Sequence, residues 1–361
     1  MTGVRRIGVA DVPALARGCA ILGTGGGGEI YTGSLVALEA LRVFGPVKVV
    51  TLADLDSDGL LLPLGMIGAP TVGVEKLPSG DEGVRLRDHL EVVTGRRAVA
   101  VMSSEIGGSN GLLPVAWAAQ LGLPLVDADS MGRAFPEVHQ VAQHVAGRLP
   151  ELIALTDAIG SVVTLRPASG PWGERIARAV TVAFGGTAAM ADYVMSVGEA
   201  RGAVVEGSVS RAIEIGRAIA EAEADPVAAL VAVVDGVRLL DGKVVDVERR
   251  TTAGFARGSV LVEGSGPDTG RLLRLEIQNE NLVALEDGVV RASVPDLITV
   301  VDATTADAIA TELVRYGQRV TVLAFGCDPI WRTPRGLETA GPRAFGYDFD
   351  YVPIEVRVAT L

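Results

Sequence analysis

Apolar residues recur at helical spacing in two segments near the N-terminus, on either side of a run of glycines. The first segment runs from the N-cap candidate Asp11 to Gly23, and the second covers residues 30–44 and stops at Gly45. Apolar positions three or four residues apart line one face of a helix, and glycine commonly ends a helix. The pattern therefore predicts a helix, a glycine loop and a second helix, in that order.

Four short apolar runs follow, each with the length of a buried β-strand. They cover residues 47–52, 60–67, 98–102 and 123–126. Residues 111–121 are long enough for a crossover helix between the last two runs, which is the arrangement that joins parallel strands. We therefore predict an α/β N-terminal domain with a mostly parallel sheet over residues 1–165.

The hydrophobic pattern changes in the second half of the chain. Helical periodicity is clearest in residues 172–183 and 211–224, and short alternating runs of strand length fill most of the remainder. We predict a C-terminal α+β domain over residues 166–361, helical in 166–235 and β-rich in 236–361.

Composition excludes several classes of protein. Apolar residues make up 48% of the 361 residues and charged residues 21%, which is typical of a globular chain. Acidic residues outnumber basic ones by 44 to 32, and this net charge of −12 repels a phosphate backbone. No apolar run reaches the ~20 residues that span a bilayer, and two cysteines make no disulfide framework. We expect a cytoplasmic protein with a small-molecule substrate and with neither nucleic acid nor membrane as partner; a homo-oligomer is compatible with the sequence.

The glycine run formally matches the G-x-G-x-x-G dinucleotide fingerprint from Gly23 onward. That fingerprint needs a strand before the glycines, whereas a helix is predicted here, and the Lys and Ser or Thr of a Walker loop are missing. No nucleotide is therefore expected. The bare backbone of Gly25, Gly26, Gly27 and Gly28 before a helix can still approach a carboxylate or a carbonyl oxygen, which predicts substrate binding. The alternative is a purely structural turn.

Polar side chains follow two neighbouring predicted strands. Glu105 and Asn110 come after the strand at 98–102, and Asp127 and Asp129 come after the next strand. Ligands of open parallel sheets bind beyond the carboxyl ends of the strands, so we expect the three carboxylates to face one crevice. Paired carboxylates can exchange protons with a substrate or hold a divalent metal. The alternative is that the aspartates cap the following helix while Glu105 is a solvated loop residue.

Histidine and serine motifs give weaker signals. Ser109 lies in a G-x-S-x-G string, but only His139 and His144 follow it, too early in the chain for a catalytic triad. These two histidines are five residues apart, about 140° around a helix, and so would not share a metal-binding face. No cofactor is favoured; zinc held by Cys327 and carboxylates stays open as an alternative.

A second polar cluster follows the predicted strand that ends at residue 325. It contains Cys327, Asp328, Arg332 and Arg335. A cysteine thiolate is a nucleophile when a positive neighbour stabilises it, and arginine can clamp a substrate carboxylate. We predict that Cys327 is a nucleophile or handles the thiol, with Asp328 or a strand-end aspartate as proton partner, and that the arginines bind substrate. The alternative is direct attack by water with Cys327 only lining the pocket.

Five longer strings carry a resemblance to a known family. They are GTGGGG at 23–28, MIGAPTVGVEKLPSGDE at 66–82, EIGGSNG at 105–111, VDADSMGRAFPE at 126–137 and WRTPRGLETAGPRAFGYDFDYVP at 331–353. Together they resemble the S-methyl thiohydantoin desulfurase family, formerly a domain of unknown function, which is associated with hydantoinase- and oxoprolinase-type enzymes. The resemblance implies a hydrolase that releases methanethiol from an S-methylated thiohydantoin ring in the catabolism of histidine-derived thiols. The alternative is a non-catalytic ligand-binding or accessory subunit of a hydantoinase- or oxoprolinase-type complex.

Overall fold

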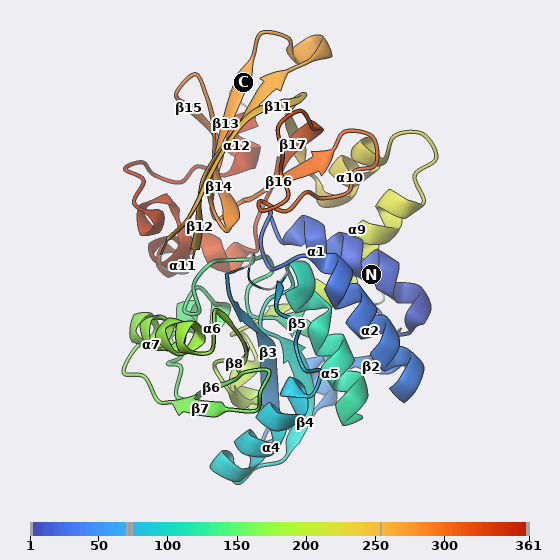
Figure 1. Ribbon diagram of the computed structural model, residues 1–361, viewed down its shortest axis with the longest axis vertical. Coiled ribbons are helices and arrows are strands. Elements are labelled where there is room, and N and C mark those ends of the chain that lie inside the picture. The colour runs from blue at the N-terminus through green and yellow to red at the C-terminus, as the bar shows by residue number, and fades with distance from the viewer. Residues whose placement is uncertain (1–2, 70–71, 73–74, 253–254, 359–361) are drawn as a thin grey trace.

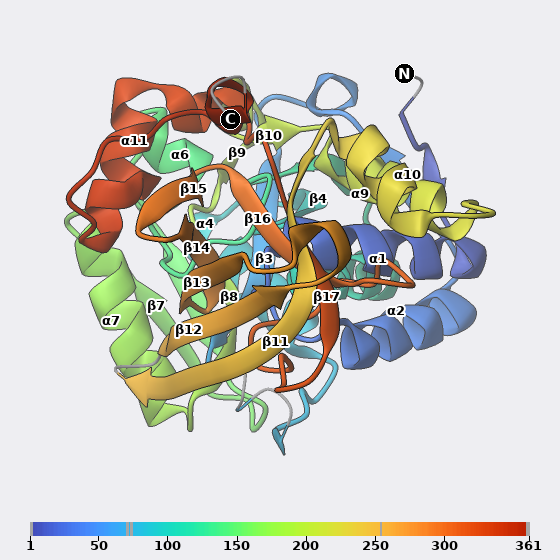
Figure 2. The same ribbon diagram turned by 90° about the horizontal axis from the view of Figure 1, so that it is seen from above.

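Two β-sheets and the helices around them make up the computed structural model, which describes residues 3–69, 72, 75–252 and 255–358 (Figure 1). The string at 66–82 therefore contains four positions, 70–71 and 73–74, that lie outside the described residues. The N-terminal part of the chain forms the α/β layers, and the C-terminal antiparallel sheet lies over one end of them, as both views show (Figure 2). No helix among the described residues has both the length and the apolar character needed to cross a bilayer.

Four parallel strands form the centre of the larger sheet. In spatial order they are β2 (Val47–Val50), β5 (Leu125–Asp129), β4 (Ala98–Ser103) and β3 (Leu60–Gly68). The first six residues of β3 are all buried, as expected for a strand covered on both faces. Antiparallel strands extend this sheet: β1 (Arg6–Ile7), β6 (Ile153–Thr156), β7 (Val162–Leu165), β8 (Thr187–Ala191), β9 (Met195–Ser196) and β10 (Val205–Glu206).

Helices cover the larger sheet. Six of them share one apolar core with the parallel strands: α1 (Val12–Leu22), α2 (Ile30–Phe44), α4 (Glu82–Thr94), α5 (Leu113–Leu121), α9 (Ser208–Ala220) and α10 (Pro226–Val234). The others are α6 (Ala142–Val145), α7 (Gly170–Ala183) and α8 (Val197–Ala200). Helix α7 contributes Ala177 to a separate cluster with residues of β3, β6 and β8. The larger sheet therefore packs against more than one apolar core.

Helices α1 and α9 touch through their backbones. A Cβ atom on Gly18 would lie 1.7 Å from the Ala212 carbonyl oxygen, and one on Gly216 would lie 1.8 Å from that of Ala14. Only glycine permits so close a crossing, because any side chain would separate the two helices. This contact fixes the position of α1, and with it the start of the glycine loop.

The smaller sheet is antiparallel throughout. Its spatial order is β15 (Val289–Ser293), β14 (Glu280–Glu286), β13 (Leu272–Gln278), β12 (Phe255–Gly264), β11 (Val237–Thr252), β17 (Arg319–Phe325) and β16 (Leu297–Asp302). The C-terminal segment adds helices α11 (Pro334–Ala340) and α12 (Ile354–Val358). Short 3-10 turns lie at Val9–Asp11, Leu52–Asp54, Gly108–Gly111, Gly266–Asp268, Pro329–Arg332 and Pro342–Phe345.

The structure confirms the predicted fold class, an α/β N-terminal part with a parallel central sheet and a C-terminal β-rich part with helices. The predicted order of helix, glycine loop and helix is present as α1, residues 23–29 and α2. Strand β14 was not predicted, and it carries one of the cavity residues described below.

Candidate active site

A cavity of about 460 Å³ lies between the larger sheet and the smaller one. Its wall includes residues at the carboxyl ends of β3 and β4, the start of α2, the segment 135–138 and the turn from β13 to β14. The position beyond the carboxyl ends of parallel strands is where open α/β sheets bind ligands. Its volume falls in the range of small-molecule sites, ~300–1,000 Å³.

Three buried carboxyl groups line this cavity: Glu105, Asp192 and Glu280. They come from the end of β4, the end of β8 and the first residue of β14. Three carboxyls do converge, but they are not the expected set of Glu105, Asp127 and Asp129, of which Glu105 alone is present. Short-range sequence patterns did not single out Asp192 or Glu280, although Asp192 directly follows a short apolar run and Glu105 lies three residues after the end of one.

Glu105 is held by donors to both carboxylate oxygens. The Asn110 side-chain nitrogen donates to Oε1 at 2.7 Å, and the Phe135 backbone N–H donates to Oε2 at 3.3 Å. Asn110 is itself fixed to β3, because its Oδ1 accepts from the Met66 N–H at 2.7 Å. Burial raises the pKa of Glu105 to about 8, against the opposing effect of these two donors. A carboxyl with this pKa exchanges a proton readily near neutral pH.

Asp192 directly follows β8, which β3 separates from β4 in the larger sheet. Its Oδ1 accepts a hydrogen bond from the Ser104 hydroxyl at 2.5 Å, and burial raises its pKa to about 6. The next residue, Tyr193, has a φ of 45°, a conformation that bulky residues rarely adopt. Such strained positions gather at functional sites, where the surrounding structure holds them in place.

The glycine loop links the two halves of the molecule through its carbonyl groups. The Thr24 oxygen accepts from the backbone and the side-chain nitrogens of Asn281, at 2.8 and 2.9 Å. The Gly25 oxygen accepts from the Thr311 N–H at 2.9 Å. Gly27 and Gly28 line the cavity, whereas Gly25 and Gly26 lie behind the lining. The loop thus has a structural role, and only its last two glycines face the cavity.

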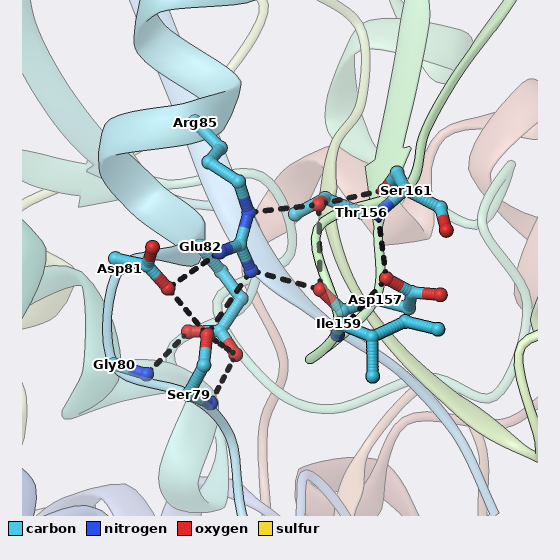
Figure 3. A network of polar contacts seen from close by, with 9 residues as sticks. All are labelled: Ser79, Gly80, Asp81, Glu82, Arg85, Thr156, Asp157, Ile159 and Ser161. Carbon is cyan, nitrogen blue, oxygen red and sulfur yellow. Dashed lines mark hydrogen bonds and ion pairs between the residues drawn. The ribbon is translucent and has the colours of Figure 1, made fainter.

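The segment before α4 forms another part of the cavity wall, and a polar network anchors it (Figure 3). Glu82 accepts from the Ser79 N–H at 2.6 Å, and Arg85 donates to the Asp157 carbonyl oxygen at 2.8 Å. Arg85 thereby ties α4 to the turn that joins β6 and β7. Lys76, which lines the cavity, donates to the carbonyl oxygen of Phe184 at 2.7 Å.

Asp127 and Asp129 do not line the cavity. Asp127 accepts from the backbone and the hydroxyl of Ser210 in α9, at 2.9 and 2.6 Å. Asp129 accepts from the backbone N–H groups of Ile106 and Met131, both at 2.9 Å. Both aspartates belong to β5 itself, and they face α9 and the adjoining loops. Of the carboxylates expected at one crevice, Glu105 alone reaches it.

The cluster around Cys327 also lies outside the cavity lining. The Cys327 N–H donates to Asp296 Oδ1 at 3.2 Å, and Arg332 pairs with the same oxygen at 2.9 Å. Burial raises the pKa of the Cys327 thiol to about 12, so the thiolate that a nucleophile needs is scarce at neutral pH. Asp328 caps the 3-10 turn that follows it, and Arg335 is exposed on α11. The structure thus does not bring Arg332 or Arg335 to the cavity.

The serine and histidine motifs show no arrangement of a catalytic triad or a metal site among the described residues. Ser109 lines the cavity, and its hydroxyl donates to the carbonyl oxygen of Glu29 at the start of α2. The rings of His139 and His144 lie 5.7 Å apart and nearly perpendicular. Helix α6 begins only at Ala142, so the helical rotation assumed for these histidines does not apply. Across the described ranges, no group of three or more His, Cys, Asp or Glu side chains is arranged to hold a metal ion.

Comparison with known proteins gives the family. The chain is similar over 97% of its length to a protein from Chromobacterium violaceum of known X-ray crystal structure, with a TM-score of 0.80, 22% sequence identity and 100% of that chain covered. At this identity the likeness shows the fold. No curated protein matches the chain. The model of the S-Me-THD-like N-terminal domain matches residues 10–167, and that of the S-Me-THD-like C-terminal domain matches residues 168–354. The chain therefore belongs to the S-Me-THD-like family, the family of S-methyl thiohydantoin desulfurase.

Proposed function

We propose that this protein hydrolyses the C–S bond of an S-methylated thiohydantoin-like ring and releases methanethiol, with Glu105 as the general base. The observation that carries this proposal is a buried carboxyl, with a pKa raised to about 8, inside a cavity of small-molecule size in a chain of this family. The reaction exchanges a C–S bond for a C–O bond at the same oxidation level, so it requires no redox cofactor.

The chemistry requires a group that takes a proton from water. Water must add to an sp² ring carbon that lies between nitrogen and sulfur, and it becomes a better nucleophile as it loses a proton. Glu105 fits this role, because its two donors, Asn110 and Phe135, support the carboxylate form while burial keeps the pKa near neutrality. Each carboxylate oxygen has a further lone pair that can accept a hydrogen bond from water.

Neighbouring groups can orient the ring. Gly27 and Gly28 bring unhindered backbone to the cavity, with φ values of 76° and 86° that favour glycine. Asn110 fixes the direction of Glu105, and it also lines the cavity. We assign the ring to the space between the end of the glycine loop and Glu105, where backbone and carboxyl groups flank it.

The proposal is tested by incubating the purified protein with an S-methyl thiohydantoin and measuring methanethiol with a thiol reagent. We expect release by the wild-type protein and a loss of about 100-fold or more in the Glu105→Gln variant, the usual contribution of a general base. An acyclic S-methyl isothiourea serves as the control substrate. Absence of thiol release and of ring hydrolysis across a panel of hydantoins would refute the proposal, and binding without turnover would favour an accessory subunit.

A further inference from the structure

Glu280 lines the cavity and has a buried carboxyl oxygen without a hydrogen-bond partner. The residue is 2% exposed, and its Oε2 has no hydrogen-bond partner among the described residues. A buried polar atom without a partner loses its hydrogen bonds to water and gains none in return, so native structures rarely retain one without a reason. A group that meets a ligand is such a reason, because the ligand supplies the missing partner.

The backbone just before β14 places the Glu280 carboxyl against the glycine loop. Asn279, just before it, has a φ of 59°, and it exchanges hydrogen bonds with Ala256 through its N–H and its Oδ1 at 2.7 and 2.9 Å. A Cβ on Gly26 would lie 2.0 Å from Glu280 Oε1. The loop therefore needs glycine at position 26 to admit the carboxyl. Gly26, the second glycine of the GGGG run, does not line the cavity itself, but it leaves room for the carboxyl of Glu280, which does.

The charge of Arg133 acts on Glu280, but the two side chains form no ion pair. Arg133 is fully buried, and its guanidinium donates to the carbonyl oxygens of Pro295 and Asp296 at 2.7 and 2.8 Å and to the Thr24 hydroxyl at 3.0 Å. Within the part of the chain that the structure describes, Glu280 forms no ion pair within 4 Å. Burial raises the pKa of Glu280, the nearby Glu105 and Glu312 carboxyls add to this effect, and the charge of Arg133 opposes it.

We propose that Glu280 is the acid of the reaction and protonates a ring nitrogen while Glu105 takes a proton from water; this assignment rests on the function proposed above. The hydrogen bonds of the two carboxyls indicate which one is the base and which one is the acid. Glu105 accepts two hydrogen bonds, which suits a carboxylate, whereas Glu280 lines the cavity and has a carboxyl oxygen without a partner, which suits a proton donor. Two carboxyls with opposite roles are a recurrent solution for acid–base chemistry at a single carbon.

The addition step balances as follows. The water oxygen forms a bond to the ring carbon, and the water proton passes to the Glu105 carboxylate. The electron pair of the C=N bond moves to nitrogen, which takes the proton of Glu280. The ring carbon is then tetrahedral and carries a hydroxyl and a methylthio group, while Glu105 is protonated and Glu280 is ionised.

Collapse of this intermediate restores both groups. The hydroxyl proton passes to the Glu280 carboxylate as the C=O bond forms. The C–S bond breaks, and the sulfur leaves with the electron pair and takes the proton of Glu105. The products are methanethiol and a hydantoin, and both carboxyls return to their starting states.

The test compares the pH dependence of methanethiol release in the wild type, in Glu280→Gln and in the control Glu286→Gln. Glu286 is also a buried carboxyl of β14, but it does not line the cavity. We expect the wild-type rate to rise as Glu105 ionises and to fall at higher pH as Glu280 ionises. Glu280→Gln should lose about 100-fold and lack the falling limb, and Glu286→Gln should keep both limbs. A Glu280→Gln variant with the wild-type rate or an intact falling limb would overturn the assignment.

Two further measurements test whether Glu280 is the acid. If Glu280→Gln does not fold, Glu280→Asp retains an acid and should keep the falling limb at a lower rate; loss of that limb would contradict the assignment. In an infrared pH titration, the wild type should show a protonated carboxyl band that persists after Glu105 and Asp192 have ionised, and Glu280→Gln should lack this band. This band needs no substrate, so its absence refutes the role of Glu280 even where a lack of thiol release has already refuted the proposed function.

Discussion

Replacing Glu105 by Gln should remove activity and stabilise the fold at alkaline pH. Burial raises the pKa of Glu105 from 4.5 in the unfolded chain to about 8. The folded protein therefore keeps a proton that the unfolded chain has already lost between these two pH values, and the free energy of unfolding falls as the pH rises through this range. Each pKa unit corresponds to about 1.4 kcal/mol, so ionised Glu105 destabilises the fold by up to about 5 kcal/mol above pH 8.

Gln removes this dependence without removing the side chain. Its carbonyl oxygen can still accept from Asn110, but its amide nitrogen cannot accept from the Phe135 N–H, which costs about 1 kcal/mol at every pH. The ionisation effect is isolated by comparing the variant with the wild type at about pH 5 and about pH 9. Glu39→Gln, at an exposed position of α2, is the matched control and should behave like the wild type at both.

Urea denaturation at the two pH values gives the free energies of unfolding. The account predicts that Glu105→Gln gains stability relative to the wild type on going from about pH 5 to about pH 9, by up to about 5 kcal/mol. An equal difference at both pH values would show that Glu105 titrates normally. That result would refute both the raised pKa and the role assigned to this carboxyl.

Three other substitutions test separate parts of the account. Cys327→Ala should keep methanethiol release within about threefold of the wild type, because the thiol lies outside the cavity; a loss of about 100-fold would restore the covalent route. Gly26→Ala should lower the free energy of unfolding in urea by about 1–3 kcal/mol and abolish release, since its Cβ would collide with Glu280; a stable, active variant would contradict the close fit. Asn110→Ala should move the rising limb of the pH profile to higher pH, because its hydrogen bond lowers the pKa of Glu105; an unchanged limb would exclude Glu105 as the titrating group.

The elements that the sequence predicts best are those whose signals are local. Helix α1 has Asp11 and Gly23 at its ends, and α2 ends at Gly45, as the apolar spacing and the capping residues indicate. The parallel strands were predicted for a similar reason, because continuous apolar runs are typical of strands buried on both faces. The structure confirms their parallel pairing.

The cavity depends on contacts that no local pattern contains. Strand β14 begins with polar residues, yet Asn281 is buried because its side chain donates to the Thr24 carbonyl, 257 positions away. Glu280 begins the same strand, and its place in the cavity can be recognised only from its contact with the glycine loop in the folded structure. The strand-end rule correctly placed Glu105 at the cavity. It could not foresee that β5 continues through Asp129, which directs both aspartates to amides of α9 and the adjoining loops.

The central claim is that water replaces sulfur at the ring carbon in this cavity. The most direct measurement is turnover of an S-methyl thiohydantoin in water labelled with heavy oxygen, followed by mass spectrometry of both products. The account predicts one methanethiol for each ring consumed and one labelled oxygen in the carbonyl of an intact hydantoin. A ring-opened product that still carries sulfur, or an unlabelled hydantoin, would contradict it.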